Sequence, residues 1–576
     1  MSWQAIIVLA VFASTIAALV RYQNNPTKIF GGVILFLYFC NLVSTEQLIA
    51  SVANPGLLTL VLLMLCSIAL EKTRLLRLVA SSIIKPSLKE TWIRLYSITV
   101  LASAALNNTA VVATLLAPIR NNPNHSASKL LLPLSYAAIL GGTLTLIGTS
   151  TNLIVNSLLI DTSGVSLGFF DFTLIGLVAV IACGVTLAFS SRFLPDNDTE
   201  EVDFHSYFID AKVQADSGLI GKSVEENGLR HLESLFLVEI VRHNKLISPV
   251  APDEVLEAGD RLVFSGDITK LMQLNQFSGL QMFADSNGLL GSNLTEVVIR
   301  PESMLNGKSL KSAGFRAQFD AAVVAIRRDG QRVSGKLGDV VLQVGDFLVL
   351  AVGGDFKNRN NLSKNFIVVS GVETESRLSG FREWIAIGGF FTAVALAAVG
   401  VVPLFKVMFI LLGILLFSGC LSPSELLRRF PKEIWLIVAA ALTLSQALHN
   451  SGLVLLLESG FGHITDPEWI MLSLLVIYVL TWLLTELVTN NAAAALMFPI
   501  AYGFAIAVDA NPMTFTMIVA FAASASFVSP YGYQTNLMVY NAGRYKLIDF
   551  FKVGFPVALV YAAVVLTLVP MMFPLS

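Results

Sequence analysis

The sequence predicts a polytopic α-helical membrane protein that is divided by an inserted α+β region. Of its 576 residues, 55% are hydrophobic and only 14% are charged, whereas soluble domains average about 45–50% apolar and about 25% charged residues. Apolar runs long enough to cross a bilayer, about 17–25 residues each, fill both ends of the chain and stop between about residues 196 and 381. These observations exclude an ordinary soluble protein and predict two membrane regions around a soluble one.

The apolar runs form two sets with the same order. Each set has three simple spans, one stretch interrupted by an asparagine pair, and two further spans. The expected spans of the first set are 3–20, 28–45, 55–70, 130–160 and 172–194, and those of the second are 383–400, 404–421, 433–450, 514–543 and 552–573. An asparagine pair is poorly placed in the middle of a simple span. The interrupted stretches, 93–119 and 468–506, are therefore predicted to be re-entrant helical hairpins.

Lysine and arginine set the predicted orientation, since short cytoplasmic loops carry an excess of both. Basic residues gather around 72–89, 120–129, 428–432 and 544–552, whereas 46–54, 161–171, 451–467 and 507–513 contain none. The alternation places the N-terminus outside, opens the first hairpin towards the cytoplasm and the second towards the outside, and leaves the inserted region cytoplasmic. Two halves of opposite orientation form an inverted repeat, the usual plan of secondary transporters.

Two motifs recur in order in both halves. The segment 107–110, Asn-Asn-Thr-Ala, corresponds to 490–493, Asn-Asn-Ala-Ala, and the pattern GxxTNLxV then occurs at 148–155 and at 532–539. The spacing from the first Asn of the pair to the Asn of the TN dipeptide is 45 residues in one half and 46 in the other. Two motifs in the same order at matched spacing are not expected by chance.

These residue types suit ion sites inside a membrane. A helix that breaks at bilayer depth is tolerated only where its freed backbone groups face protein or a wet cavity. Unwound carbonyls with Asn and Thr oxygens can replace the water shell of Na⁺, while helix N-termini direct N–H groups at an anion. Gly148 and Gly532 permit the turns, and Ser529-Pro530 weakens the helix before the second break. Such side chains also bond neighbouring helices, but their repeat-related positions favour ion sites and predict a broken helix in each half.

The two motifs together resemble the divalent anion:sodium symporter family, also called the sodium-sulfate/carboxylate family. Its hallmark is a Ser-Asn-Thr motif at each hairpin tip, joined by a broken helix in each half, and the resemblance covers both membrane regions. It implies one sodium site from Asn108, Gly148, Thr151 and Asn152, and a second from Asn491, Gly532, Thr535 and Asn536. It implies an anion between the tips, near Asn107, Asn108, Thr109, Asn490 and Asn491, with Ser150, Thr149 and Tyr533 as further donors. A homodimer is implied as well.

The tips depart from the family pattern in ways that bear on the substrate. Asn replaces Ser at both tips, and Ala492 replaces Thr at the second, so a carboxylate-binding hydroxyl is missing there. Sulfate or another small tetrahedral oxyanion needs only convergent donors. The predicted function is therefore Na⁺-coupled symport of a divalent oxyanion, with sulfate preferred and a dicarboxylate as the second choice.

Glu486 is the clearest acid inside an apolar stretch and lies one helical turn before Asn490. An intramembrane carboxylate is a functional hypothesis by default. It can bind Na⁺, titrate as a proton site, or brace the hairpin by bonding backbone or a neighbouring helix. The alternatives are a Na⁺/H⁺-type antiporter of the same ion-transporter superfamily, in which Glu486 titrates, and a membrane sensor with the inserted region as output.

The inserted region contains a duplication with an offset of 86 residues. Gly-Lys-Ser at 221–223 recurs at 307–309, and the Gly-Asp at 259–260 recurs at 345–346. The pattern resembles two TrkA-C domains. The predicted division is a first membrane repeat, two such domains and a second membrane repeat, at 1–195, 196–285, 286–380 and 381–576.

Gly-Lys-Ser alone suggests a phosphate-binding loop, but the glycine required five residues upstream is missing, with Asp216 and Glu302 in its place. A cap after a strand explains the motif. The resemblance implies a dimer contact or a sensor of a nucleotide or other small anion, with Arg242, Arg327 and Arg328 as basic candidates, and a folded spacer is the alternative.

Other classes of function are disfavoured. The net charge of −2 argues against a nucleic-acid-binding protein, because such proteins carry a basic patch or domain. The four cysteines are scattered in apolar runs without metal-site spacing. No catalytic dyad or metal cluster appears, so we expect a transporter in a bacterial inner membrane, with Na⁺ as coupling ion, no other cofactor and no catalytic residues.

Overall fold

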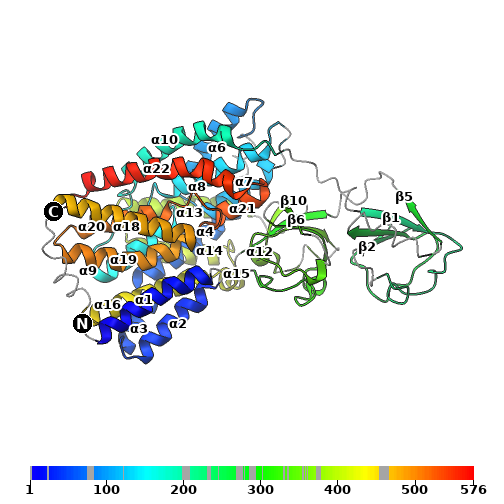
Figure 1. Cartoon of the computed structure of the whole chain (residues 1–576), viewed down its shortest axis with the longest axis horizontal. Coiled ribbons are helices and arrows are strands. Elements are labelled where there is room, and N and C mark those ends of the chain that lie inside the picture. The colour runs from blue at the N-terminus through cyan, green and yellow to red at the C-terminus, as the bar shows by residue number, and fades with distance from the viewer. Residues whose placement is uncertain are drawn as a thin grey trace. The chain divides into compact units, whose positions relative to one another are not determined.

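The computed structural model divides the chain into two compact units (Figure 1). It describes residues 3–575 except 23–24, 74–82, 121, 123, 198–207, 230–234, 244, 267–276, 278, 284–293, 301–302, 329–330, 334–336, 353–355, 357–358, 360, 371–377 and 453–465. The helical unit comprises Met1–Asp196, Arg377–Val539 and Lys546–Ser576, and the inserted unit comprises Asn197–Ser376 with Tyr540–Tyr545. The expected boundary between residues 285 and 286 lies outside the described residues.

Both halves of the helical unit consist of apolar helices. The first half contains α1 (Trp3–Arg21), α2 (Pro26–Phe39), α3 (Thr45–Val52), α4 (Pro55–Glu71), α6 (Leu88–Ser103), α7 (Asn108–Arg120), α8 (Leu131–Gly142), α9 (Ser150–Ser163) and α10 (Thr173–Ser190). The second contains α13 (Phe381–Ala398), α14 (Leu404–Phe417), α15 (Pro423–Arg428), α16 (Lys432–Asn450), α18 (Pro467–Leu487), α19 (Asn490–Ala507), α20 (Pro512–Ser524), α21 (Gln534–Ala542) and α22 (Leu547–Met572). Seven helices in the described part of the chain are long and apolar enough to span a membrane, which confirms the predicted polytopic helical class.

Each half contains a helical hairpin followed by an interrupted helix. The hairpins are α6–α7 and α18–α19, which turn at residues 104–107 and 488–489. The expected span 130–160 is interrupted between Gly142 and Ser150, and the span 514–543 between Ser524 and Gln534. We call the segments 143–149 and 525–533 the first and second breaks. Because α18 and α19 each reach spanning length, the re-entrant character of the hairpins stays a prediction, as does the inverted orientation of the halves.

Helices from the two halves pack against one another throughout the core. α10 packs on α22, α9 on α19 and α20, α4 on α14, and α2 on α16. All twelve residues of α8 are buried, as expected for a helix that is apolar on every side and enclosed by protein. The first break and most of the second are likewise buried, which satisfies the requirement for irregular backbone in a membrane, whereas α6 and α18 keep exposed apolar side chains such as Leu101 and Leu480.

The inserted unit contains two five-stranded antiparallel sheets of identical strand order. The first consists of β1 (Phe208–Val213), β2 (Leu235–Arg242), β3 (Lys245–Ile247), β4 (Arg261–Gly266) and β5 (Leu280–Phe283), in the order β3-β2-β4-β1-β5. The second consists of β6 (Leu294–Ile299), β7 (Ala321–Arg328), β8 (Gln331–Arg332), β9 (Phe347–Val352) and β10 (Phe366–Ser370), in the order β10-β6-β9-β7-β8. Each strand of the second sheet begins 86 residues after its counterpart, and the bulge in β2 recurs at the matching place in β7.

Candidate functional site

The hairpin tips are defined by side-chain caps at the start of α7 and α19. Asn107 Oδ1 accepts the N–H of Thr109 at 2.9 Å, and the Thr489 hydroxyl accepts the N–H of Ala492 at 3.3 Å. Such caps satisfy backbone donors that a helix start leaves free. Because Asn107 and Thr489 occupy the same position, the sequence pairing of the two asparagine pairs is wrong by one residue.

The corrected pairing changes the chemistry of the second tip. Asn108 corresponds to Asn490, and Thr109 to Asn491. The second tip therefore does begin with a hydroxyl residue, Thr489, contrary to the expectation that Asn stands there. The capping preference of Ser, Thr, Asn and Asp immediately before a helix is the signal that could have found it.

Each break is closed by the asparagine of its TN dipeptide. Asn152 Nδ2 donates to the Thr145 carbonyl at 3.0 Å, and Asn536 Nδ2 donates to the Ser529 carbonyl at 3.3 Å, seven residues back in both cases. Asn536 Nδ2 also donates to the Ser526 carbonyl at 2.9 Å. The two halves therefore use the same local hydrogen bond to hold an unwound segment.

In both halves a hydroxyl of the hairpin hydrogen-bonds a backbone carbonyl of the broken helix. Ser103 donates its hydroxyl to the Ala138 carbonyl of α8 at 2.8 Å, and Thr485 donates to the Ala523 carbonyl of α20 at 3.0 Å.

The first break also requires a glycine where its backbone passes close to the end of α8. A Cβ on Gly148 would lie 2.5 Å from the Gly142 carbonyl oxygen, too close to be accommodated.

Contacts between the halves bring four helix starts to one place. The Asn108 amide hydrogen-bonds the Tyr533 hydroxyl at 2.7 Å, and Thr109 donates to Gln534 Oε1 at 3.3 Å. Ser150 donates to Asn491 Oδ1 at 2.7 Å. These residues stand at or next to the first residues of α7, α9, α19 and α21. The Tyr533 hydroxyl also hydrogen-bonds Thr149, next to the start of α9, which connects the α7–α21 pair with the α9–α19 pair. Four positive dipole ends therefore meet among neutral polar side chains, an arrangement suited to an anion.

Gln534 was not predicted from the sequence, although it contacts a predicted residue. It occupies the position in the second GxxTN motif that Ser150 occupies in the first. Aligning the two repeats could therefore have identified Gln534 as a site residue. It was missed because an amide stands where the first half has a hydroxyl. Tyr533, which the sequence offered as a further donor, lies against the tip of the other half, where its hydroxyl hydrogen-bonds Asn108.

The predicted sodium ligands are buried, except Asn491, which is half-buried, and they hydrogen-bond different neighbours. Thr151 hydrogen-bonds Ser524 of α20 at 2.7 Å. Thr535 and Asn536 face the Ser135 hydroxyl of α8, which lies 2.8 Å from Thr535 Oγ1 and 2.7 Å from Asn536 Oδ1. Asn108 packs against Gly142, where an added Cβ would lie 2.8 Å from the side-chain amide of Asn108. Asn491 directs its oxygen at Ser150 of the other half, so the second predicted set is not gathered at one point.

Oxygen atoms that the sequence did not single out gather at Gly532. A Cβ there would lie 2.5 Å from the Thr485 carbonyl oxygen and 2.6 Å from the Ser526 hydroxyl. Ser526 is fully buried, and its hydroxyl has no hydrogen-bond partner among the described residues. A buried hydroxyl without a partner is costly, and oxygen ligands of this kind suit a hard cation such as Na⁺. Thr485 and Ser526 thus join Gly532 as candidate ligands.

Glu486 lies in the last turn of α18 and faces the second break. Its carboxylate accepts the backbone N–H groups of Phe527 at 2.9 Å, Val528 at 2.8 Å and Ser529 at 2.9 Å. Of the three interpretations left open by the sequence, these contacts correspond to bracing.

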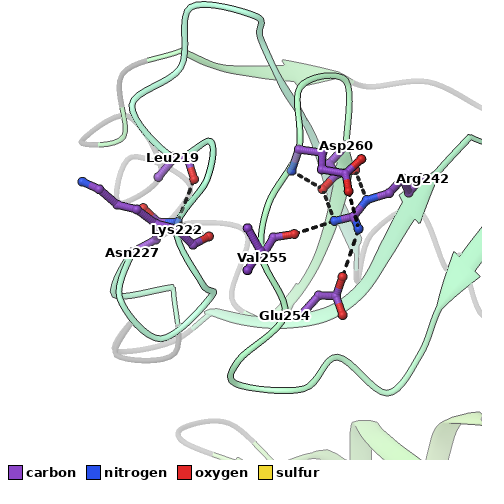
Figure 2. A network of polar contacts seen from close by, with 8 residues as sticks. Leu219, Lys222, Asn227, Arg242, Glu254, Val255 and Asp260 are labelled. Carbon is purple, nitrogen blue, oxygen red and sulfur yellow. Dashed lines mark hydrogen bonds and ion pairs between the residues drawn. The ribbon is translucent and has the colours of Figure 1, made fainter.

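The basic candidates of the inserted unit are engaged within their own sheets. Figure 2 shows Arg242, whose Nε and Nη2 donate to Asp260 at 2.8 Å each, with Glu254 at 3.1 Å. The hydrogen bonds with Asp260 raise the pKa of the Arg242 guanidinium. Arg328 makes the same fork to Asp346 at 2.7 Å, and Arg327 lies over the Phe347 ring at 5.7 Å. The three arginines therefore hold strands together.

The Gly-Lys-Ser motifs form turns whose serine amides are already hydrogen-bonded. The Ser223 N–H donates to Glu226 at 2.8 Å, and the Glu226 N–H donates back to the Ser223 hydroxyl at 3.2 Å. The N–H bond from Ser223 lowers the pKa of Glu226. Ser309 makes the equivalent exchange with Ser312. This reciprocal capping explains the motif without a phosphate.

Comparisons with known proteins agree with a transport site. Residues 5–520 match the model of CitMHS, the citrate transporter family. An uncharacterised transporter of Synechocystis sp. is 30% identical over 96% of this chain and 94% of its own length. Sodium/sulfate cotransporter 1 of Chlamydomonas reinhardtii is 29% identical over 66% of this chain, which spans 46% of that protein. An uncharacterised transporter of Escherichia coli K12 is 27% identical over 82% of both chains.

Proposed function

The chain belongs to CitMHS, the citrate transporter family, and from that premise we propose that it carries a divalent oxyanion together with Na⁺, with sulfate as the preferred anion. As an integral membrane transporter it is not an enzyme, as the sequence predicted. The observation that carries the proposal is the meeting of four helix starts from both halves, joined by Asn108–Tyr533, Thr109–Gln534 and Ser150–Asn491.

The chemistry of this meeting point favours a small, fully ionised oxyanion. Sulfate carries two charges at neutral pH and accepts hydrogen bonds without donating any. Hydroxyl and amide groups with the positive ends of four helices supply donors and partial positive charge. The similarity to the Chlamydomonas sodium/sulfate cotransporter supports sulfate, whereas membership of the citrate transporter family supports a carboxylate. A dicarboxylate therefore remains the second choice.

Cation sites are proposed beside the anion, at the carbonyl ends of helices. α6, α8, α18 and α20 all end at the hairpins and breaks, and helix C-termini carry partial negative charge. The Thr485 carbonyl and the partnerless Ser526 hydroxyl at Gly532 support one Na⁺ position. Asn108 with the neighbouring Gly142 and Gly148 supports the other.

Transport requires the site to open on each side in turn. We infer an elevator or rocking movement of the hairpins and broken helices against the remaining helices, in a bacterial inner membrane with the inserted unit cytoplasmic. A homodimer and a small ligand for the inserted unit remain predictions of the family resemblance. No contact among the described residues favours an antiporter or a sensor over a symporter.

Uptake of radioactive sulfate into proteoliposomes tests the proposal. An inward Na⁺ gradient should drive accumulation that an equal K⁺ gradient does not, and unlabelled thiosulfate should compete better than succinate or citrate. Uptake that is indifferent to Na⁺ would overturn symport. Strong competition by succinate with none by sulfate would overturn the substrate. A pH change on adding Na⁺ without an anion would favour the antiporter.

Two alanine variants, measured in the same uptake assay, test whether Asn108 belongs to the transport site. Asn108→Ala removes the link to Tyr533 and should reduce Na⁺-driven uptake at least about tenfold, the effect of losing roughly one hydrogen bond to a charged or buried group. Asn450→Ala is the matched control, because Asn450 bonds Leu42 and Gln47 instead. Equal kinetics in both variants would remove Asn108 from the site.

A further inference from the structure

The backbone N–H groups of the two breaks have different acceptors. In the first break the acceptors are backbone carbonyl oxygens. Thr143 donates to the Leu140 carbonyl at 3.2 Å, Leu144 to that of Gly141 at 3.1 Å, and Leu146 to that of Phe169 at 3.2 Å. In the second break, the three consecutive amides of 527–529 all donate to the Glu486 carboxylate. These amides of the first break are held by backbone carbonyls, whereas those of the second break are held by one side chain.

The first hairpin has no acid at the matching position. When the caps Asn107 and Thr489 are superposed along the sequence, Glu486 corresponds to Ala104. Ala104 contributes its carbonyl, which accepts the Thr145 hydroxyl at 2.5 Å. The second break also contains Pro530, which has no N–H to enter a backbone turn. The dependence on a carboxylate is therefore a property of the second half alone.

Glu486 is joined on both sides to the candidate cation ligands. Its neighbour Thr485 turns its carbonyl towards Gly532. The amides that it holds lie between the Ser526 and Ser529 carbonyls, both of which accept the Asn536 amide. Hydrogen bonds to an ionised acceptor are about twice as strong as neutral ones. The carboxylate therefore fixes the segment that carries Ser526.

We propose that Glu486 is the positioning residue of the second cation site and makes the two Na⁺ positions unequal. Its carboxylate keeps the second break in shape, so that the Thr485 carbonyl, the Ser526 hydroxyl and the backbone at Gly532 converge on one Na⁺. Glu486 neither touches that ion nor carries a proton through the cycle. The first position is independent of it. This inference rests on the proposed Na⁺-coupled function.

The Na⁺ dependence of uptake by Glu486→Gln tests the role. The amide is isosteric but uncharged, and it has a single acceptor oxygen for the three amides. The Na⁺ concentration for half-maximal uptake should rise about tenfold, the size expected from one lost hydrogen bond to a charged group. The Hill coefficient for Na⁺ should fall towards one, and the maximal rate at saturating Na⁺ should stay within about twofold of wild type.

Glu468→Gln is the matched control, since Glu468 lies on the same helix in its exposed first turn. It should retain the wild-type Na⁺ curve. An unchanged Na⁺ curve in Glu486→Gln would overturn the inference, as would a lower maximal rate with unchanged half-saturation. Wild-type uptake without any Na⁺ dependence would instead refute the proposed function, which separates the two failures.

Ser526→Ala provides a second variant that breaks no hydrogen bond seen in the described residues. It should raise the same half-saturation concentration. Combined with Glu486→Gln it should add less than the product of the two single effects, because both act on one ion. Full multiplicativity would overturn the shared site.

Hydrogen exchange in the wild-type protein tests the brace without transport. The amides of 527–529 should exchange slowly even without Na⁺, because the carboxylate rather than the ion holds them. In Glu486→Gln they should exchange at least about tenfold faster, while segment 143–149 should be unchanged. Rapid exchange of 527–529 in wild type without Na⁺ would overturn the inference.

Discussion

Gly532 shows how a single missing Cβ governs the geometry of the second break. Its backbone lies against the Thr485 carbonyl and the Ser526 hydroxyl so closely that any side chain would displace one of them. Gly148 has the same restriction against the Gly142 carbonyl. The glycines of the GxxTN motifs are therefore needed for close approach of backbone, in addition to the turn that the sequence indicated.

Gly532→Ala should abolish Na⁺-driven uptake, to below about one tenth of wild type, because the added methyl forces the Thr485 carbonyl out of place. Uptake into proteoliposomes at matched protein content measures the loss. Gly413→Ala on α14, where a Cβ meets nothing within 4 Å, should transport normally. Normal uptake by Gly532→Ala would contradict the close packing at the break.

Arg328 and Asp346 allow a comparison between the two sheets of the inserted unit. The corresponding pair, Arg242 and Asp260, has further carboxylates nearby, with Glu254 and Glu257 at 3.1 Å. The positions equivalent to these two acids in the second sheet are occupied by Val340 and Gln343. The two sheets therefore differ in the residues that stand at these two positions beside the arginine–aspartate pair.

Asp346→Asn should destabilise its sheet by about 2 kcal/mol, because the carboxylate accepts two hydrogen bonds from Arg328 and one from the Gln343 N–H, and an amide keeps a single acceptor oxygen. Asp260→Asn should cost less, since Glu254 and Glu257 still face Arg242. Limited proteolysis of the full chain at increasing temperature, with fragments identified by mass, reports each sheet separately. Equal sensitivity of the two sheets, or greater sensitivity of the first, would contradict this ranking.

The C-terminal end of α9 is fastened to two other helices. Asp161 accepts from Asn54 Nδ2 at 2.9 Å and from Gln446 Nε2 at 3.1 Å. Asn54 is the cap of α4, where its Oδ1 accepts the N–H of Gly56 at 2.8 Å, and Gln446 lies on α16. One carboxylate thus connects a broken helix to two helices that are neither hairpin nor broken, and any relative movement must break these bonds.

Asp161→Ala should lower the stability of the purified protein by about 2 kcal/mol, since it removes two hydrogen bonds to a charged acceptor. The midpoint of thermal unfolding in detergent measures the effect. Asp161→Asn, which keeps one acceptor oxygen, should lose less. Asp171→Ala serves as a comparison, because Asp171 accepts a local bond from the Gly168 N–H. A larger loss in Asp171→Ala would contradict the fastening role.

Much of the element plan was predictable from the sequence, for physical reasons. Apolar length gave the helices, and the repeated Asn pairs and GxxTN patterns gave the two tips and both breaks within a few residues. The one-residue error at the second tip arose because matching identical letters, Asn with Asn, ignored capping by Thr489. Side-chain pairs such as Ser150–Asn491 lie 341 residues apart, and no local pattern specifies which half a tip will face.

The two halves of the helical unit are joined by contacts between them. Lys72 pairs with Glu425 at 2.9 Å, and Arg429 pairs with Glu71 at 2.9 Å. Tyr136 of α8 donates its hydroxyl to the Phe527 carbonyl in the second break. The predicted opposite orientation of the halves is a property of the whole chain, and the basic loops are its basis.

Thiol labelling tests that orientation. In a Cys40→Ser background, Glu46→Cys should react with a membrane-impermeant maleimide in intact cells. Ser424→Cys should react only after permeabilisation, because it borders the basic loop around 428–432. Both positions are exposed, so access depends on the side of the membrane. Labelling of Ser424→Cys in intact cells would contradict the predicted topology.

The link between Asn108 and Tyr533 spans 425 residues of chain, and this separation has a consequence for biosynthesis. At about 5–20 residues per second, the ribosome needs roughly 20–85 s after making Asn108 before Tyr533 exists. Through that interval Asn108 has its neighbour Ser103 but lacks its partner from the second half, while both sheets of the inserted unit are synthesised. Truncation anywhere before residue 532 therefore removes the second-half partners of Asn108 and Thr109 and leaves the second Na⁺ position, which needs Gly532, unfinished.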